Sequence, residues 1–333
     1  MIFGCRGTTL DDDEKAFFAE ADPLGFILFG RNVENARQLR ALVQELRDVV
    51  TRPDAPVLID QEGGRVARLG PPEWREVPAA ATIGRLAETD QEAGEEAAWL
   101  NARLIARDLR HLGVTVDCAP VVDVPAADGH PVIGDRAFSA DPNVVKALGR
   151  AASLGLLAGG VTPVVKHIPG HGRATTDSHE ALPVVDTDYD TLWETDFLPF
   201  RALAHMPWAM TAHVVFSALD RENPATLSRD VIHGVVRDTI GYDGVLVTDD
   251  LSMEALSGSL ADRAEGALKA GCDVVLHGSG DMDGMEAVAG VVPQVRKSSL
   301  RRLMAAEDRR QNLPVPLIDD ARMRLSMLLE EVA

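Results

Sequence analysis

Short apolar runs alternate with segments of helical periodicity along most of this 333-residue chain. In the segment 95–112, apolar residues recur every three or four positions, which is the spacing of one helix face. The runs between such segments are too short for helices, and they are rich in β-branched residues, as buried strands are. Eight strands are therefore predicted, at residues 1–3, 25–29, 57–59, 114–122, 162–167, 209–215, 244–248 and 273–277.

Helices predicted between these strands make the pattern one of repeated strand–helix units. They fall at residues 35–49, 95–112, 142–158, 188–205, 228–240 and 260–270. Strands that are near-continuous apolar runs and alternate with helices are typical of a parallel sheet covered on both faces. Eight units predict an α/β fold, a closed (β/α)₈ TIM barrel. A doubly wound open sheet is the alternative, but no GxGxxG motif follows the early strands.

The chain contains no proline- or serine-rich linker, so residues 1–333 are expected to form a single catalytic barrel domain. After the eighth strand, closing helices are predicted from about residue 282 onward. We expect them to pack against the outside of the barrel, at residues 282–292, 298–311 and 318–332.

Charged side chains gather where the predicted strands end. Barrel enzymes place their active sites at the carboxyl ends of the strands, so this distribution favours an enzyme over a purely structural scaffold. The residues at or near strands three to seven are, in order, Asp60, Asp123, Lys166 with His167, His213, and Asp249 with Asp250.

The stretch 162–183 joins a predicted strand to a loop rich in ionisable groups. Its apolar run ends at Lys166 and His167, after which proline and glycine residues prevent regular structure. The loop carries Asp177 and His179, two positions apart, so in extended backbone both side chains project to the same side. A carboxylate so placed can orient an imidazole and favour its protonated form. We expect the loop to be mobile without ligand, because its polar residues and glycines have little to pack against.

Asp249 and Asp250 end the seventh predicted strand, and as neighbours on a strand they are expected to point in opposite directions. Only one should face the barrel mouth, and periodicity does not say which. A carboxylate facing a cleft opposite His179 would supply a nucleophile or base and a general acid, the pair that glycoside hydrolysis needs. On spacing alone, metal-dependent hydrolysis remains an alternative.

Basic side chains in the same loops could hold sugar hydroxyls by charge-assisted hydrogen bonds. The candidates are Arg68, Arg136 and Lys166, with Asp60 as an acceptor. Arg65 is instead expected to form a structural ion pair with a neighbouring acid.

Charge and cysteine usage narrow the choice of partner and compartment. The formal net charge is −19, and no basic stripe is present, so nucleic acid and anionic membranes are not expected partners. The 3 cysteines are widely spaced, which predicts a reducing compartment. The start of the chain lacks a signal-peptide pattern, and no apolar run could span a bilayer. We expect a soluble cytoplasmic protein with no obligate protein partner.

Six short motifs together resemble the β-N-acetylglucosaminidases of glycoside hydrolase family three. The combination of KHIPGHG with DSH is highly specific, and the likeness covers nearly the whole chain. More narrowly, the chain is similar to the bacterial cytoplasmic enzymes that recycle peptidoglycan. The other four motifs are DQEGGRV, IGDRAF, MTAHV and TDDLSM.

This resemblance implies a single-domain barrel and a retaining mechanism through a covalent glycosyl-enzyme. It implies Asp249 as the nucleophile and His179 as the general acid and then base, tuned by Asp177. The implied reaction releases a non-reducing terminal N-acetylglucosamine from a muropeptide that contains 1,6-anhydro-N-acetylmuramic acid, with no metal or organic cofactor. The positions that match the family's sugar-binding residues are Asp60, Arg68, Arg136, Lys166 and His167.

Three other readings compete with this one. A metal-dependent hydrolase would use His167, His171, His179 and His213, but no His-x-His pair ends a strand. A non-catalytic sugar-binding barrel gives no joint role to Asp177, His179 and Asp249. Phosphorolysis would use the same residues, because a histidine, unlike a carboxylate, does not repel an attacking phosphate.

Overall fold

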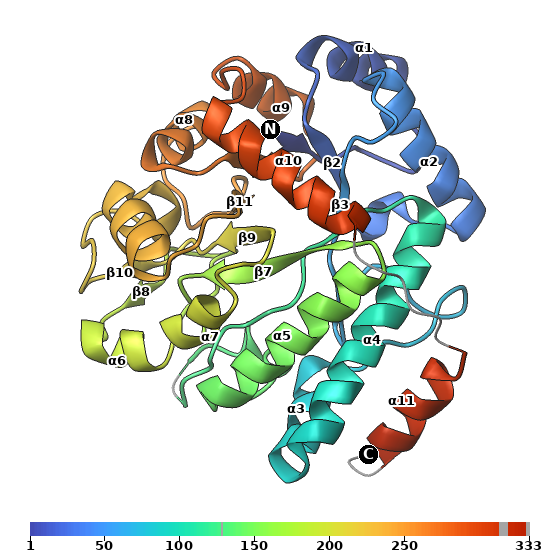
Figure 1. Cartoon of the computed structure of the whole chain (residues 1–333). Helices are drawn as coiled ribbons and strands as arrows, with labels where there is room; N and C mark the ends of the chain where they lie inside the picture. The colour runs from blue at the N-terminus through green and yellow to red at the C-terminus, as the bar shows by residue number, and fades with distance from the viewer. Residues whose placement is uncertain (128, 313–318, 331–333) are drawn as a thin grey trace.

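Eight parallel strands close into a barrel in this computed structural model, which describes residues 1–127, 129–312 and 319–330 (Figure 1). Each strand pairs with its neighbours in chain order, and the last pairs with the first. The predicted (β/α)₈ barrel is therefore confirmed. The barrel strands are β1 (Ile2–Phe3), β2 (Gly25–Leu28), β3 (Val57–Ile59), β6 (Val116–Asp117), β7 (Thr162–Ile168), β9 (Trp208–Thr211), β11 (Val245–Asp250) and β12 (Val274–His277).

Helices surround the barrel, and most lie where apolar periodicity predicts them. They are α1 (Asp12–Ala21), α2 (Ala36–Val49), α3 (Ala80–Thr89), α4 (Gln91–Leu112), α5 (Pro142–Ala158), α6 (Tyr189–Glu194), α7 (Phe197–Ala202), the π-helix η4 (Asp230–Thr239), α8 (Leu260–Ala270) and α9 (Met282–Ala289).

The structure differs from the sequence prediction at helices α1 and α3 and across residues 188–205. Helix α1 was not predicted, because Glu14 and Phe18 are the residues it buries, too few for an apolar face. Helix α3 was also missed. The single helix predicted at 188–205 is two short helices. Pro199 lacks an N–H donor and is tolerated in the first turn of a helix, which is where α7 places it.

Side chains alternate along the strands between the barrel interior and the helix layer. Val164 and Val245 belong to an apolar cluster inside the barrel, whereas Val165 and Leu246 belong to the cluster under the helices. On the barrel strands themselves, charged residues lie at or near the carboxyl ends: Asp117, Lys166, Asp249 and Asp250.

Helix α10 (Lys297–Asn312) lies across the amino-terminal end of the barrel and crosses in front of the strands in Figure 1. It was expected on the outside, but Leu303 and Ala306 join the interior apolar cluster and close that end. Helix α11 (Ala321–Glu330) instead packs against α4. None of the described helices combines the length and apolar character needed to cross a membrane.

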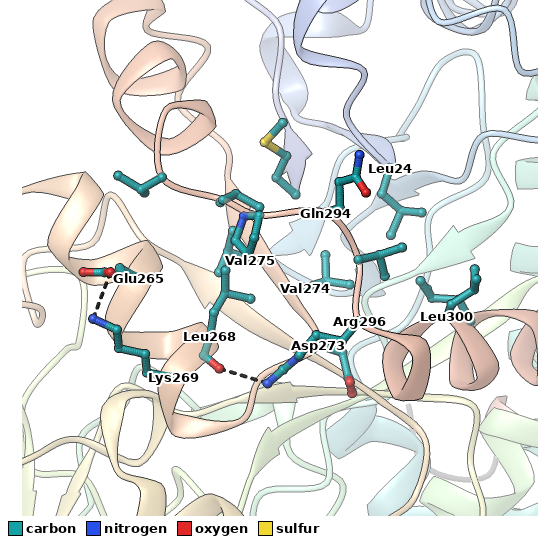
Figure 2. Close-up of a pocket in the computed structure, with 16 residues that line it drawn as sticks. Leu24, Glu265, Leu268, Lys269, Asp273, Val274, Val275, Gln294, Arg296 and Leu300 are labelled. Atoms are coloured by element: carbon teal, nitrogen blue, oxygen red, sulfur yellow. Dashed lines mark hydrogen bonds and ion pairs between the residues drawn. The ribbon is translucent and has the colours of Figure 1, made fainter.

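A cavity of about 510 Å³ opens at the amino-terminal end, between α8, α10 and the starts of strands β1 and β12. Figure 2 shows that aliphatic side chains such as Leu268, Val274 and Leu300 make up much of its wall. Its charged groups are engaged locally: Lys269 pairs with Glu265, and Arg296 donates to the Leu268 carbonyl.

Two small sheets extend the barrel beyond the carboxyl ends of its strands. The hairpin β4 (Gln61–Gly63) with β5 (Val66–Ala67) follows β3, and β8 (Val184–Val185) pairs with β10 (Val215–Phe216). Both sheets belong to the loops around the carboxyl-terminal opening of the barrel.

Candidate active site

A cavity of about 600 Å³ occupies the carboxyl-terminal end of the barrel. All eight residues predicted for catalysis or sugar binding line it, although they come from four different strand ends and the loops that follow them. They are Asp60, Arg68, Arg136, Lys166, His167, Asp177, His179 and Asp249.

One wall of the cavity is a chain of buried ion pairs. Lys166 Nζ lies 2.9 Å from Asp60 Oδ1 and 2.7 Å from Glu62 Oε1. Arg136 holds Glu62 through two nitrogens, at 2.8 and 2.9 Å, and Arg68 Nη2 lies 3.1 Å from Asp60 Oδ2. The Lys166 side chain is 3% exposed and that of Glu62 6%, so both groups depend on these partners.

Charge alternates along this chain, and the pKa values shift accordingly. Burial opposes ionisation of the Asp60 carboxyl, but Lys166 and Arg68 outweigh it and hold its pKa well below the usual range. Burial likewise opposes the charge on Lys166, but Asp60 and Glu62 raise its pKa. The wall therefore stays charged at neutral pH and offers fixed donors and acceptors to a polar ligand.

Strand β11 delivers two acids to the cavity rather than one. Val245 and Val247 lie inside the barrel, and Asp249 continues their face. The pairing with β12 shifts register between Val247 and Asp250, and Asp250 also lines the cavity. The expectation that only one acid faces the mouth was wrong, because a bulge breaks the alternation on which it rested.

The two acids have different surroundings. Asp250 Oδ1 accepts hydrogen bonds from the backbone N–H groups of Ser252, at 2.9 Å, and Gly278, at 3.2 Å. Asp249 Oδ2 faces His167 Nε2 at 3.9 Å. Burial raises the pKa of Asp249, but its basic neighbours, Lys166 among them, lower it below the ordinary value. Asp249 is an ionised carboxylate with an oxygen directed into the cavity.

His167 is held by Asp123 from behind. Asp123 Oδ2 lies 2.7 Å from His167 Nδ1, and Asp123 Oδ1 accepts the backbone N–H groups of His167 and His171. Burial lowers the pKa of His167 well below its usual value, so the ring is neutral near pH 7. With its proton on Nδ1 facing Asp123, the Nε2 lone pair points toward the cavity and can accept a hydroxyl proton.

Asp177 and His179 form a pair on the loop after β7, as their spacing predicts. Asp177 Oδ1 accepts both the His179 backbone N–H, at 2.9 Å, and a hydrogen bond from its Nδ1, at 2.7 Å. Partial burial raises the pKa of Asp177, but these bonds outweigh it and lower the pKa. The His179 side chain is 65% exposed, which leaves its Nε2 free to exchange protons with a ligand or water.

Two residues that the structure places around the site were not predicted from the sequence to have a role in it. Glu62 was not among the predicted site residues, yet it joins Lys166 to Arg136. Its position two residues after Asp60 could have shown that both carboxylates share one side. Asp123 was noted at its strand end but received no role. The structural ion pair expected for Arg65 is confirmed with Asp135, at 2.9 Å.

The histidines considered as metal ligands do not surround a common point. His213 lies between Thr226 Oγ1 and the Asp250 carbonyl, at 2.7 and 3.1 Å, and His179 is on the exposed loop. Across residues 1–127, 129–312 and 319–330, no group of three or more His, Cys, Asp or Glu residues has a metal-binding arrangement.

Comparison with known proteins places this geometry among glycosidases. Residues 8–313 match the family described as Glycosyl hydrolase family 3 N terminal domain. A beta-hexosaminidase of Aromatoleum aromaticum is 36% identical over 317 residues, covering 93% of this chain and 88% of the relative. One from Thioalkalivibrio sulfidiphilus is 41% identical over 280 residues, covering 83% and 79%.

Solved structures agree with the sequence relatives. NagZ from Neisseria gonorrhoeae in complex with N-trifluoroacetyl-D-glucosamine superposes with a TM-score of 0.88 at 29% identity, covering 100% of this chain and 98% of its own. A glycoside hydrolase family 3 beta-N-acetylglucosaminidase from Paenibacillus sp. gives 0.87 at 32% identity, covering 99% and 67%.

Proposed function

The chain belongs to glycosyl hydrolase family 3 and is a β-N-acetylhexosaminidase, and from this premise we propose that it is a retaining exo-β-N-acetylglucosaminidase of muropeptides. The observation that carries the proposal is one cavity lined by an ionised Asp249, by the Asp177–His179 pair and by the buried charged wall. These are the groups that a two-step glycoside hydrolysis requires.

In the first step, the Asp249 carboxylate attacks the anomeric carbon and His179 protonates the departing oxygen. The bond from that carbon to the leaving oxygen breaks as the bond to Asp249 Oδ forms. Asp177 supports this step because its carboxylate holds His179 Nδ1 at 2.7 Å and so orients the ring. Asp60, Lys166, Arg68, Arg136 and His167 hold the sugar hydroxyls.

In the second step, the now neutral His179 takes a proton from water, and that water displaces Asp249 from the sugar. Two displacements at the same carbon return the original β-configuration. The exposure of His179 suits this double role, since the same nitrogen must meet first the leaving group and then a water molecule.

The substrate proposed is a muropeptide fragment with N-acetylglucosamine at its non-reducing end and 1,6-anhydro-N-acetylmuramic acid next to it. The motif resemblance supports this substrate and a cytoplasmic location. The cavity is closed below by barrel side chains and open at the His179 loop, which suits removal of a single terminal sugar.

The direct test is turnover of 4-nitrophenyl N-acetyl-β-D-glucosaminide and the matching β-glucoside, followed by the GlcNAc-anhydromuramyl peptide. We expect cleavage of the first and third but not of the glucoside. Cleavage of neither aryl glycoside would overturn the proposal. The same assay in phosphate buffer, with analysis for sugar 1-phosphate, tests phosphorolysis, which the histidine acid/base makes chemically accessible.

A further inference from the structure

Ser178 lies between Asp177 and His179 in the sequence but faces the opposite way. Of residues 175–182, all of which the structure describes, it is the only buried residue. It is 3% exposed, whereas the His179 side chain beside it is 65% exposed. A hydroxyl buried in an exposed polar loop needs a partner, because an unpaired one destabilises the fold.

That partner is His171, at the base of the same loop. His171 Nε2 lies 3.0 Å from Ser178 Oγ, and both side chains are buried. Burial lowers the pKa of His171, so its ring is neutral. The Nδ1 atom of His171 has no hydrogen-bond partner among the described residues, so the bond to Ser178 is the polar contact that this ring makes there.

His171 is itself fixed to the sugar-binding side of the cavity. Its backbone N–H donates to Asp123 Oδ1 at 2.7 Å, and Asp123 also holds His167. The two imidazole rings meet edge to face, 5.5 Å apart. The loop segment that carries His179 is thereby tied to the residue that positions His167.

A second tie joins Ser178 to the nucleophile side. The Ala255 backbone N–H donates to the Ser178 carbonyl oxygen at 3.2 Å, and Ala255 belongs to the loop that follows Asp249 and Asp250. His179 contacts Asp177, which lies on the same loop. Ser178 thus links the loop both to the His167 side of the cavity, through His171, and to the segment that follows Asp249, through Ala255.

We propose that the hydrogen bond between Ser178 and His171 sets the position of His179 over the cavity, which makes Ser178 a positioning residue for proton transfer. The inference rests on the proposed function, because it assumes that His179 protonates the leaving group. It differs from the simple view that Ser178 satisfies a buried histidine, since that view predicts a loss of stability alone.

The test compares Ser178→Ala with Ser153→Ala, using kcat/KM on phenyl and 2,4-dinitrophenyl N-acetyl-β-D-glucosaminides. Ser153 is a matched control: it is buried, and its hydroxyl donates one hydrogen bond, to the Gly149 carbonyl within α5. Dinitrophenolate leaves without protonation, whereas phenolate needs it. We expect Ser178→Ala to lose roughly 10- to 100-fold on the phenyl substrate and less than about 3-fold on the other.

Two further variants separate positioning from folding. His171→Phe keeps a ring but removes the partner nitrogen, and it should show the same dependence on leaving group. In a His179→Ala background, Ser178→Ala should add less than about 2-fold on either substrate, because residues that act as a unit are not additive. The melting temperatures of Ser178→Ala and Ser153→Ala should fall by similar amounts.

Equal losses of Ser178→Ala on both substrates, or a loss that persists without His179, would overturn this inference and leave the proposed function intact. If wild type cleaves neither aryl substrate, the proposed function fails and this inference fails with it.

Discussion

The wall that carries Asp60, Glu62 and Lys166 is buried and locked in ion pairs, whereas the loop that carries Asp177 and His179 faces solvent across the same cavity. On the wall, each charge depends on its neighbours, and the groups are rigid parts of the fold. On the loop, Asp177 and His179 contact one another, and Ser178 between them is buried. In the proposed mechanism, sugar binding therefore belongs to the buried side and proton transfer to the exposed side.

This difference predicts how substitutions on each side should behave. Changes to the fixed side should alter both stability and activity, since buried charges are left without partners. Changes to the exposed His179 side chain of the loop should alter activity while the fold is unaffected. Asp249 lies where the two sides meet, and its substitution should have the largest effect on turnover.

Asp249→Asn should lower kcat by roughly 10⁴-fold or more, because the amide cannot attack the anomeric carbon. The measurement is steady-state turnover of 4-nitrophenyl N-acetyl-β-D-glucosaminide. The folded state should persist, with an unchanged circular dichroism spectrum. Retention of more than a few per cent of wild-type kcat would remove Asp249 from the nucleophile role.

Lys166→Met should leave Asp60 and Glu62 without their shared cation and cost about 3–5 kcal/mol of unfolding free energy. Urea denaturation measures this cost, and kcat/KM should fall in parallel because the sugar loses a donor. The control is Lys146→Met, which removes a lysine whose hydrogen bond to Asn143 lies at the protein surface. Equal stability of the two variants would contradict a buried ion-pair wall.

His179→Ala should leave unfolding free energy within about 0.5 kcal/mol of wild type, since its side chain is mostly exposed. The value of kcat/KM, which reports formation of the glycosyl-enzyme, should fall by roughly 10²-fold or more on phenyl glycosides, and far less on dinitrophenyl ones. Added azide should restore turnover of the activated substrate by replacing water as the second nucleophile. Equal losses on both substrates would take His179 out of the acid role.

Asp250→Asn should have the smallest effect, less than about 10-fold in kcat/KM. Its Oδ1 accepts two backbone N–H groups, and the asparagine oxygen can accept the same bonds. The assay is the one used for Asp249→Asn. If the two variants lose similar activity, or if Asp250→Asn loses more, the nucleophile must be reassigned.

The barrel could be predicted from sequence because its signals are local and repeated. Each strand is an apolar run and most helices have an apolar face, so α4 and α5 follow directly from periodicity. The position of α10 could not be predicted in this way. An amphipathic helix needs an apolar surface to cover, and periodicity does not distinguish the side of the barrel from its open end.

The candidate site, like the barrel, could be predicted from the sequence only in part. Strand ends identified Lys166, and residue spacing identified the Asp177–His179 pair. Ser178 could not be predicted, because the loop was expected to have little to pack against and its burial depends on His171 folding back. The inward position of Asp250 also required the structure, since a bulge does not appear in the alternation of apolar residues.

The central claim is that Asp249 forms a covalent bond to the sugar, while His179 first donates a proton to the leaving group and then accepts one from water. The most direct measurement is mass spectrometry of His179→Ala after rapid mixing with 2,4-dinitrophenyl N-acetyl-β-D-glucosaminide. This variant can form the intermediate but hydrolyses it slowly, because it lacks the base. We predict one N-acetylhexosamine adduct on the peptide that contains Asp249, attached at that residue. An adduct on Asp250, or turnover without any adduct, would contradict the account.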